Sequence, residues 1–494
     1  MRWGWLVAIA ACGGGSSKPQ PDGPGLPSGD AQVPQAVCSA PPLADTSSPT
    51  QTVGDGTPAS CTEAALAAAA AAGGTIVFAC GTQPVTIAVT QTITFTAETV
   101  VDGGNLVTLD GGGTTRILYL DSNYNATTPR LTVQRLAFTR GMGPATGDDT
   151  ARGGGAIYRD GGSLTVIDCS FDDNHAGATG QDLAGGAIYG FGGGETVIAG
   201  STFRNNSASD GGAVGSLNGN LTLVNTTLDG NAATGTGGNP GNGGCGGAVY
   251  MDGTHEMTSL CGVKLVNSTA GAIGGGFFRV SNDHTGAFAM DRSTVDHNVV
   301  TATTSGNAGG LYLEGLALDI TSSTISRNQA FYNGGIWINT CSVQMTNDTI
   351  AENIATGSNG GGVWLGNGPT GTMQNCTIAN NHSTAMGQVA GGIFGGGLTL
   401  VNTIVANNTA MYTPTCDVKR TDGTGDLQWP DGSLCTTSPL VADPMLGALA
   451  DNGGDTETML VPAGSPAKGL GTSCPATDQR GMPRGNPCTA GAVE

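Results

Sequence analysis

Aromatic and basic residues are scarce in this sequence. Phe, Trp and Tyr make up 5% of the 494 residues, which is a poor basis for an ordinary layered globular core. The sequence has only 18 Lys and Arg residues but 38 Asp and Glu residues, so the formal net charge is −20. Because phosphate contacts require clustered basic residues, this balance argues against nucleic acid and anionic membranes as partners. Solvated acidic faces are the simplest explanation of the excess.

Common metal-ligand and redox motifs are also missing. The sequence contains no Cys-x-x-Cys, so zinc binding and dithiol chemistry have no support. The five histidines share no spacing that would join them as ligands: His175, His255, His284, His297 and His382. We therefore predict no cofactor and no metal site, while structural calcium in the acidic loops stays open.

The apolar run near the N-terminus is short. It extends from Trp3 to Ala11, too few residues to span a bilayer as a helix, and Cys12 follows directly. This pattern resembles a bacterial lipoprotein signal, which implies that residues 1–11 are removed and that Cys12 carries the lipid. A clipped ordinary signal peptide or a wrongly assigned start is the alternative. We expect an exported protein, held by this lipid at the outer membrane or cell surface of a bacterium.

The segment after Cys12 predicts a tether, and the cysteine count fits export. Residues 12–57 are rich in Gly, Ser and Pro, which is typical of a flexible linker. Thirteen cysteines minus a lipidated Cys12 leave twelve, an even number that suits disulfides in an oxidising compartment. Neighbours in sequence suggest four pairs without fixing the connectivity: Cys61–Cys80, Cys245–Cys261, Cys416–Cys435 and Cys474–Cys488.

Glycine, by contrast, is abundant, with 85 residues. A double glycine that runs into apolar residues recurs nine times, with a mean spacing of about 30 residues. The copies begin at Gly154, Gly185, Gly211, Gly246, Gly275, Gly309, Gly334, Gly361 and Gly391. A period of this length is typical of a solenoid, in which stacked repeats bury a common core.

A second phrase lies between the glycine pairs: two apolar residues separated by one position, a third apolar residue, then asparagine. The asparagines are Asn174, Asn206, Asn231, Asn298, Asn328, Asn353, Asn381 and Asn408, and the copy near Asn267 is degenerate. Short alternating pieces broken by Gly and Asn indicate strands and turns. The sequence therefore predicts an all-β fold: a right-handed, single-stranded parallel β-helix of the pectin lyase-like kind over residues 58–440.

Stacked coils should align equivalent residues in vertical files. We expect the asparagines to stack, with their amides hydrogen-bonded along the file. A second asparagine file is expected at Asn347, Asn375 and Asn402. Small residues occupy the next position: Cys169, Ser201, Thr226, Ser293, Ser323, Cys376 and Thr403. We interpret these files as structural, with Cys169 and Cys376 as compact buried residues rather than nucleophiles.

An open solenoid needs caps at its ends. Between Ser60 and Gly81, Ser and Thr precede a run of alanines and a Gly-Gly stop, which predicts a short capping helix that leads into the first coil.

Two stretches are specific enough to suggest a family. The GGAI and GGAV phrases with Phe171-x-x-Asn174 and Phe203-x-x-Asn206 resemble the repeats of chlamydial polymorphic outer membrane proteins, which are β-helical surface adhesins. The end of the chain, from Asp451 through CPATDQRGMPRGNPCTAGAVE, is similar to the closing module of the choice-of-anchor Q family. These resemblances imply a surface β-helix used in adhesion, with a closing segment at residues 441–494. The chlamydial proteins end in an autotransporter barrel, whereas this chain stops without barrel strands.

The alternative is a polysaccharide lyase or glycoside hydrolase on the same scaffold. Such an enzyme should present paired carboxylates, or a cation site with a basic residue, on adjacent coils. The best candidate cluster is Asp172, Arg204 and Asp229, which share one phase of three successive repeats. They lie beside the asparagine turns, where solvated charges are common. We therefore predict no catalytic residue and keep these three as weak candidates.

One feature exceeds a plain scaffold. In three successive repeats an aromatic residue stands between two aliphatic ones, at Tyr312, Trp337 and Trp364, with weaker versions at Phe278 and Phe394. Strand alternation sends the flanking aliphatics to the core and the aromatics outward. Such a row predicts either a platform for a glycan or surface partner, or an aromatic column shielded by a long loop or by the C-terminal segment.

Overall fold

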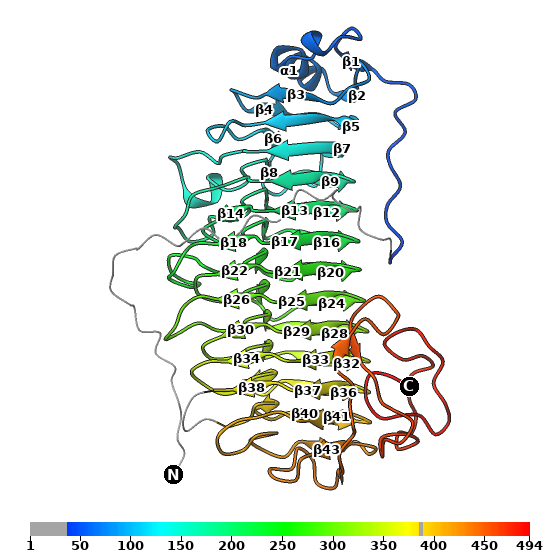
Figure 1. Cartoon of the computed structure of the whole chain (residues 1–494). Helices are drawn as coiled ribbons and strands as arrows, with labels where there is room; N and C mark the ends of the chain where they lie inside the picture. The colour runs from blue at the N-terminus through cyan, green and yellow to red at the C-terminus, as the bar shows by residue number, and fades with distance from the viewer. Residues whose placement is uncertain (1–36, 385–388) are drawn as a thin grey trace.

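The chain winds into a parallel β-helix, as the repeats predict. The structure is a computed structural model that describes residues 37–384 and 389–494. Its coils stack along one axis, and equivalent strands of successive coils pair in parallel (Figure 1). Asn328, Asn353 and Asn381 lie in one file, as the stacking of the repeats requires. The predicted all-β fold class is confirmed.

Within the described residues the strands form three parallel sheets and a two-stranded hairpin. The 26-stranded sheet contains β1 (Gln51–Val53), β2 (Gly74–Phe78), β3 (Val85–Ala88), β5 (Thr99–Asp110), β7 (Arg130–Thr139), β9 (Ser163–Ile167), β10 (Ser170–Asp172), β12 (Glu195–Ala199), β13 (Thr202–Arg204), β16 (Asn220–Val224), β17 (Thr227–Asp229), β20 (Met257–Cys261), β21 (Lys264–Val266), β24 (Gly286–Asp291), β25 (Thr294–Asp296), β28 (Leu316–Thr321), β29 (Thr324–Ser326), β32 (Ser342–Thr346), β33 (Thr349–Ala351), β36 (Thr370–Gln374), β37 (Thr377–Ala379), β40 (Leu398–Val401), β41 (Ile404–Ala406), β42 (Thr421–Asp422), β43 (Leu427–Trp429) and β44 (Leu440–Val441). The 11-stranded sheet contains β4 (Ile93–Phe95), β6 (Leu118–Asp121), β8 (Ile157–Asp160), β11 (Ile188–Phe191), β15 (Val214–Leu217), β19 (Val249–Gly253), β23 (Phe277–Ser281), β27 (Leu311–Glu314), β31 (Ile336–Asn339), β35 (Val363–Gly366) and β39 (Ile393–Phe394). The 7-stranded sheet contains β14 (Ser207–Ala208), β18 (Ala232–Ala233), β22 (Thr269–Ala270), β26 (Val299–Val300), β30 (Gln329–Ala330), β34 (Ile354–Ala355) and β38 (His382–Ser383), and the hairpin joins β45 (Leu449–Ala450) to β46 (Thr458–Met459).

The glycine pairs are required by the stacking itself. A Cβ at Gly334 would lie 2.4 Å from the Ile354 nitrogen and 2.6 Å from the Gly361 oxygen, both in the next coil. Real Cβ atoms do not approach backbone this closely, so the position accepts only glycine. The equivalent glycine of every other repeat meets backbone of a neighbouring coil in the same way. The repeat motif therefore marks the place where successive coils come closest.

The asparagine file forms a buried hydrogen-bond ladder. Asn328 Nδ2 donates to Asn353 Oδ1 at 3.0 Å, and Asn353 Nδ2 donates to Asn381 Oδ1 at 2.9 Å. Ser268 occupies the equivalent position in the degenerate repeat, and the side-chain ladder is interrupted there. The ladder confirms that the asparagines are structural.

Apolar side chains fill the interior, but the guanidinium groups of Arg159 and Arg279 lie there as well. Phe138, Phe171 and Phe203 stack with ring planes 3° apart. Arg159 is fully buried, and its Nη1 donates to the Gly162 carbonyl at 3.0 Å. Burial lowers its pKa to about 10. Arg279 has the equivalent position in a later coil and pairs with Glu256.

A helix covers the first coil, as predicted. The helix α1 (Glu63–Ala72) begins after Thr62, whose hydroxyl accepts a hydrogen bond from the Ala65 nitrogen, and it ends at Gly73. It buries Leu66 against the first strands. Two 3₁₀ turns, η1 (Pro58–Ser60) and η2 (Asp149–Ala151), complete the helical residues among those described. No helix in this part of the chain is long and apolar enough to cross a membrane.

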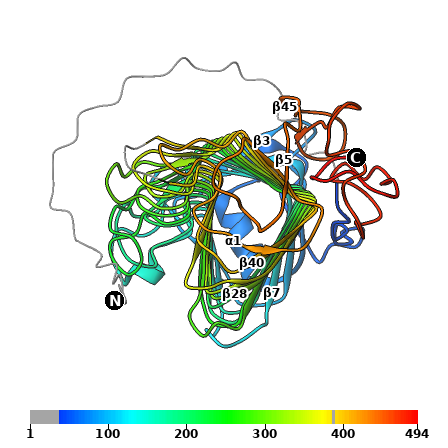
Figure 2. The ribbon, with the colours of Figure 1, turned by 90° about the horizontal axis from the view of Figure 1, so that it is seen from below.

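The described N-terminal residues from residue 37 onward and the C-terminal segment lie along one edge of the solenoid (Figure 2). This edge, the seam, is the turn that joins strands such as β32 and β33 in each coil. Asn225, Asn347, Asn375 and Asn402 stand on it with positive φ. The amide of Asn225 accepts from the Val37 and Cys38 nitrogens and donates to the Cys38 oxygen at 2.7 Å.

The C-terminal segment uses the lower half of the same seam. Asn347 Nδ2 donates to the Thr477 oxygen at 3.0 Å, and Arg484 Nη2 donates to Asn347 Oδ1 at 2.7 Å. Gln479 is buried and binds Thr324 and Thr349 of the adjoining strands. The second asparagine file is therefore structural, and it also docks the segment predicted to close the solenoid.

The predicted tether meets the structure only in its last part. Residues 37–57 contain β1 and the seam contacts just described, so these residues are docked on the solenoid. Side-chain amides of distant coils hold them, which composition does not reveal. Cys12, the predicted signal peptide at residues 1–11 and residues 12–36 lie outside the described residues.

Three of the four suggested disulfides form: Cys61–Cys80, Cys416–Cys435 and Cys474–Cys488. The pairing of Cys245 with Cys261 is wrong. Cys261 bonds Cys38, 223 residues away, because the N-terminal segment from Cys38 to Thr46 lies along the seam. Cys245 is a buried thiol, as are Cys169, Cys341 and Cys376.

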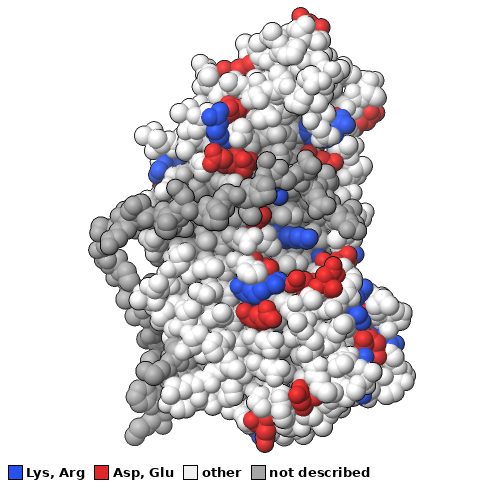
Figure 3. All heavy atoms as spheres, in the orientation of Figure 1, with Lys and Arg blue, Asp and Glu red and all other residues white. Residues whose placement is uncertain are grey.

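On the face shown in Figure 3, charged side chains form small mixed groups without a broad patch of one sign.

Candidate ligand-binding surface

The predicted aromatic row lies on the outer face of the 11-stranded sheet. Leu311 and Leu313 are buried in the core, and Tyr312 between them points outward. The row is longer than the sequence analysis recognised, because Tyr158 and Tyr189 of the GGAIY phrases belong to it. In register the file is Tyr119, Tyr158, Tyr189, Gly215, Tyr250, Phe278, Tyr312, Trp337, Trp364 and Phe394.

The rings of this file stack on one another. Tyr312 and Trp337 have centroids 6.0 Å apart with planes 12° apart, and Trp337 and Trp364 have centroids 4.5 Å apart with planes 21° apart. Trp364 and Phe394 follow at 4.4 Å, tilted by 49°. The faces of Tyr312 and Trp337 are therefore occupied by neighbouring rings, so part of their edges is directed away from the solenoid.

Loops cover the file from Tyr158 to Phe278, here called its upper half, although Tyr119 at the upper end is half-buried. Tyr189 donates to the Asp182 oxygen at 2.8 Å, and the Tyr250 hydroxyl bonds Asp182 and Asn239 of two such loops. Tyr250 is 0% exposed and Phe278 is 1% exposed. In this half the aromatic column is therefore shielded by loops, which is the second of the two alternatives given by the sequence. The Phe278 side chain is directed outward but is not exposed to solvent.

The lower half stays partly open. Tyr312, Trp337, Trp364 and Phe394, here called the lower stripe, are each half-buried. Two residues after each of the first three, the same strands carry Glu314, Asn339 and Gly366 in register. This second outward file, the polar file, runs beside the lower stripe.

Hydrogen bonds order the polar file. The Tyr312 hydroxyl donates to Glu314 Oε2 at 2.7 Å. Burial, with Glu314 beside it, raises the pKa of Tyr312 well above its usual range. Asn339 Oδ1 accepts from Asn367 Nδ2 at 2.9 Å. A Cβ at Gly366 would lie 2.9 Å from Asn339 Oδ1 and 3.6 Å from Trp337 Cζ2, so glycine keeps open the space between the files.

The weak catalytic candidates are neighbours in space. Asp172, Arg204 and Asp229 are paired in register on β10, β13 and β17. Asn205 Nδ2 donates to Asp172 Oδ1 at 3.1 Å, and no ion pair joins Arg204 to either carboxylate within the described residues. They line neither the cavity beside Asp102 nor the one beside Phe288. They stay a weak prediction.

An acidic network that sequence reasoning missed lies under the upper loops. Burial raises the pKa of Asp210 well above its ordinary value, and its Oδ1 accepts from the Cys245 nitrogen at 2.9 Å. Burial also raises the pKa of the Cys245 thiol, which suits an inert residue. Asp252 accepts from Asn239 and Asn282. These contacts tie the covering loops to β19.

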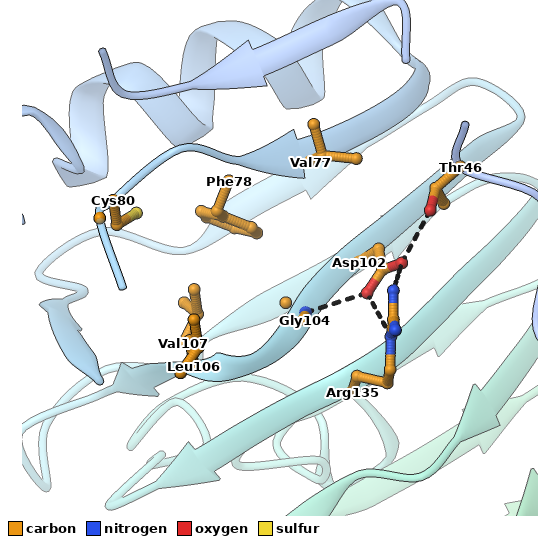
Figure 4. Close-up of a pocket in the computed structure, with 11 residues that line it drawn as sticks. Thr46, Val77, Phe78, Cys80, Asp102, Gly104, Leu106, Val107 and Arg135 are labelled. Carbon is orange, nitrogen blue, oxygen red and sulfur yellow. Dashed lines mark hydrogen bonds and ion pairs between the residues drawn. The ribbon is translucent and has the colours of Figure 1, made fainter. Parts of the chain in front are cut away.

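A cavity of about 210 Å³ opens near the first coils (Figure 4). Its polar group is Asp102, which accepts from Arg135, Gln134, Thr46 and the Gly104 nitrogen. Burial opposes the charged form, but these donors hold the pKa of Asp102 below its usual value. Because these contacts engage both carboxylate oxygens, the group fastens the N-terminal segment at Thr46 rather than offering a reactive acid.

Among the described residues, one group could supply three ligand atoms to a metal ion: Cys38, Cys261 and Asp291. Their ligand atoms lie within 4.8 Å of one another. Cys38 and Cys261 form a disulfide, so their sulfurs are not thiolate ligands.

Comparison with known proteins gives a limited result. No family model matches the chain, and no curated protein matches it. Among solved structures, the A-module of Azotobacter vinelandii mannuronan C-5 epimerase AlgE6 is similar, at 13% identity and a TM-score of 0.40, over 77% of this chain and 100% of that chain. The A-module of AlgE4 from the same organism is similar at 13% identity and a TM-score of 0.23, over 78% of this chain and 90% of that chain. The resemblances to polymorphic outer membrane proteins and to the choice-of-anchor Q family stay predictions.

Proposed function

We propose that this protein is an exported, lipid-anchored β-helix that binds a glycan at the cell surface through the lower stripe, without catalysis. The observation that carries the proposal is the contrast along the aromatic file. Loops seal the file from Tyr189 to Phe278, but the file continues through Trp337 and Trp364 with its ring edges partly exposed. Exposed aromatic rows are unusual on a soluble protein unless they meet a ligand.

The scaffold suits display at a surface. Four disulfides favour an oxidising compartment, which is consistent with export. Two of them fasten the ends of the solenoid, and Cys38–Cys261 fastens the segment that follows the proposed tether. A rigid rod with a net charge of −20 stays soluble and resists self-association.

A glycan array that spans neutral, amino and acidic sugars tests the binding proposal. We expect the full chain to bind at least one class, and Trp364→Ala to lose most of the signal. Met257→Ala, a change at an exposed residue of β20 on another face, is the matched control and should bind normally. Circular dichroism must first show that Trp364→Ala keeps its β content. No binding by the wild type, or equal binding by Trp364→Ala, would refute the proposal.

Metabolic labelling with a fatty acid analogue tests the anchor. The wild-type chain expressed in a Gram-negative host should incorporate the label and partition with membranes, and Cys12→Ala should do neither. A labelled Cys12→Ala protein would contradict lipidation at this residue.

A further inference from the structure

We infer that the ligand of the lower stripe is an uncharged glycan chain that lies along the solenoid axis. This inference rests on the proposed function and specifies its ligand class. It comes from three features of the stripe: the direction of the ring edges, one unpartnered amide, and the absence of basic residues.

The ring edges select an oxygen-rich, uncharged ligand. An aromatic ring is electron-rich on its faces and electron-poor at its edge. In the lower stripe the faces contact one another, as the 4.5 Å stack of Trp337 on Trp364 shows, so edges meet the ligand. Cations prefer the faces, which are occupied, whereas the lone pairs of hydroxyl and ether oxygens are attracted to the edges. A polyhydroxylated chain fits this surface better than a cationic peptide.

Asn339 supplies an unused donor beside these edges. The residue is 8% exposed, and its Oδ1 accepts from Asn367. Its Nδ2 has no acceptor among the described residues, yet it is not sealed from solvent, since it is absent from the buried atoms that lack a partner. Cζ2 of the Trp337 indole borders the same space over Gly366, whereas the indole Nε1 is buried without a hydrogen-bond partner. A fixed amide donor beside apolar ring edges is the pairing that a sugar hydroxyl requires.

Charge excludes the anionic alternative. The segments that build the lower stripe are residues 301–315, 329–340, 356–369 and 389–397, and they contain no Lys or Arg. Their single acidic residue is Glu314, which faces outward beside Tyr312. A uronate or sulfate chain would meet this carboxylate with no exposed cation to compensate it, since the Arg420 guanidinium beside Ile393 is buried and paired with Asp417. Glu314 can instead accept a hydrogen bond from a neutral sugar hydroxyl.

The spacing of the stripe suits a repeating ligand. Coils follow one another at about 4.8 Å, close to the rise of one sugar unit in an extended chain, on the order of 5 Å. The aromatic residues of the lower stripe come from four successive coils. We therefore expect binding to strengthen with chain length up to about four sugar units and then to level off.

Affinity electrophoresis with paired polymers tests the inference. The neutral probes are hydroxyethylcellulose, mixed-linkage β-glucan, galactomannan and soluble chitin oligomers, and the anionic probes are polygalacturonate and alginate. We expect retardation of the full chain by at least one neutral probe, with little effect of salt. Asn339→Asp, which keeps the shape but replaces the donor with a charge, should weaken this binding about tenfold or more. Asn367→Asp, at the exposed neighbour, should weaken it less.

The outcomes separate this inference from the proposed function. Retention that depends on Trp364 but occurs only with the anionic polymers, or that Asn339→Asp leaves unchanged, would overturn the inference and leave glycan binding intact. Absence of retention by every polymer and array sugar would refute both. Glu314→Gln gives a further check, because an anionic ligand would bind this variant more tightly than the wild type, whereas a neutral ligand would not.

Discussion

Replacement of Asn353 by alanine should destabilise the solenoid strongly, because this residue makes four hydrogen bonds in the buried ladder. Its Nδ2 donates to Asn381 Oδ1 and to the Ile325 oxygen, both at 2.9 Å. Its Oδ1 accepts from the nitrogen and the Nδ2 of Asn328, both at 3.0 Å. At about 1 kcal/mol for each bond, with a further penalty for the stranded Asn328 nitrogen, the loss is about 3–5 kcal/mol.

Serine at the same position provides an internal comparison. In the degenerate repeat Ser268 occupies the ladder position, and its Oγ still accepts from the Asn231 nitrogen at 3.4 Å. Asn353→Ser should therefore cost less than Asn353→Ala, by about 1–2 kcal/mol. Gln344→Ala, on the exposed face of β32 in the same coil, should change stability by less than about 0.5 kcal/mol.

Hydrogen exchange measured by mass spectrometry is the appropriate assay, since a solenoid of nearest-neighbour coils need not unfold in one step. We expect faster exchange in β29, β33 and β37, with β9 unaffected. The guanidinium concentration at which the lower coils unfold should also fall, and it should fall further for Asn353→Ala than for Asn353→Ser. Equal midpoints for Asn353→Ala and wild type, or equal effects of alanine and serine, would refute the claim that the ladder stabilises the stack.

Three further predictions follow from single contacts. Gly334→Ala places a Cβ 2.4 Å from backbone of the next coil, so we expect a loss of more than about 3 kcal/mol in thermal melts, and a tolerated variant would contradict the close stacking. Burial raises the pKa of Asp426 to about 7, so the stability tied to its neutral form is present below pH 4 and is lost as pH rises through 7. Asp426→Asn should thus exceed wild type by about 2–4 kcal/mol at pH 8 and match it at pH 4, and equal melts at both values would contradict the shift. Non-reducing peptide mapping should find Cys38 joined to Cys261, and Cys38→Ser should expose residues 39–45 to limited proteolysis while Cys245→Ser should not.

The repeat geometry was readable from the sequence because stacking imposes the same local demand on every coil. A Cβ would clash at the equivalent glycine of each repeat, and the ladder positions other than Ser268 carry asparagine. Such constraints recur at fixed spacing, so they leave a periodic signal. The capping helix was readable for a local reason as well, since Thr62, the alanine run and Gly73 specify it within a dozen residues.

Contacts that do not recur from repeat to repeat were not predicted from the sequence. Arg159 and Arg279 look like surface charges in a strand, yet they lie inside, where turn carbonyls or Glu256 accept their hydrogen bonds. The partner of Cys261 was missed because the described N-terminal segment lies along the seam before it enters the first coil, which places Cys38 beside a coil far along the sequence. Asn225 carries no local sign that its amide binds this segment.

The aromatic file shows where sequence prediction of a site reaches its limit. Alternation around Trp337 fixed the direction of the side chain, because flanking aliphatics must enter the core. Exposure depends instead on which loops fold over the file, and the loop that carries Asn239 reaches Tyr250 but not Trp337. The outward direction was therefore predictable, and the boundary between the covered and open halves was not.

That boundary is the main argument for a ligand. Other parts of the chain do cover such surfaces. Loops bury Tyr189 and Tyr250 completely, and both terminal segments cover the seam. If the lower rings were only part of the scaffold, aliphatic or polar residues would complete the outer face at less cost than half-exposed tryptophans. Trp337 and Trp364 instead continue the file beside a polar file that holds an unused amide and no basic residue. The open lower stripe thus supports the proposal of an uncharged partner, since loops of the same chain cover the neighbouring rings.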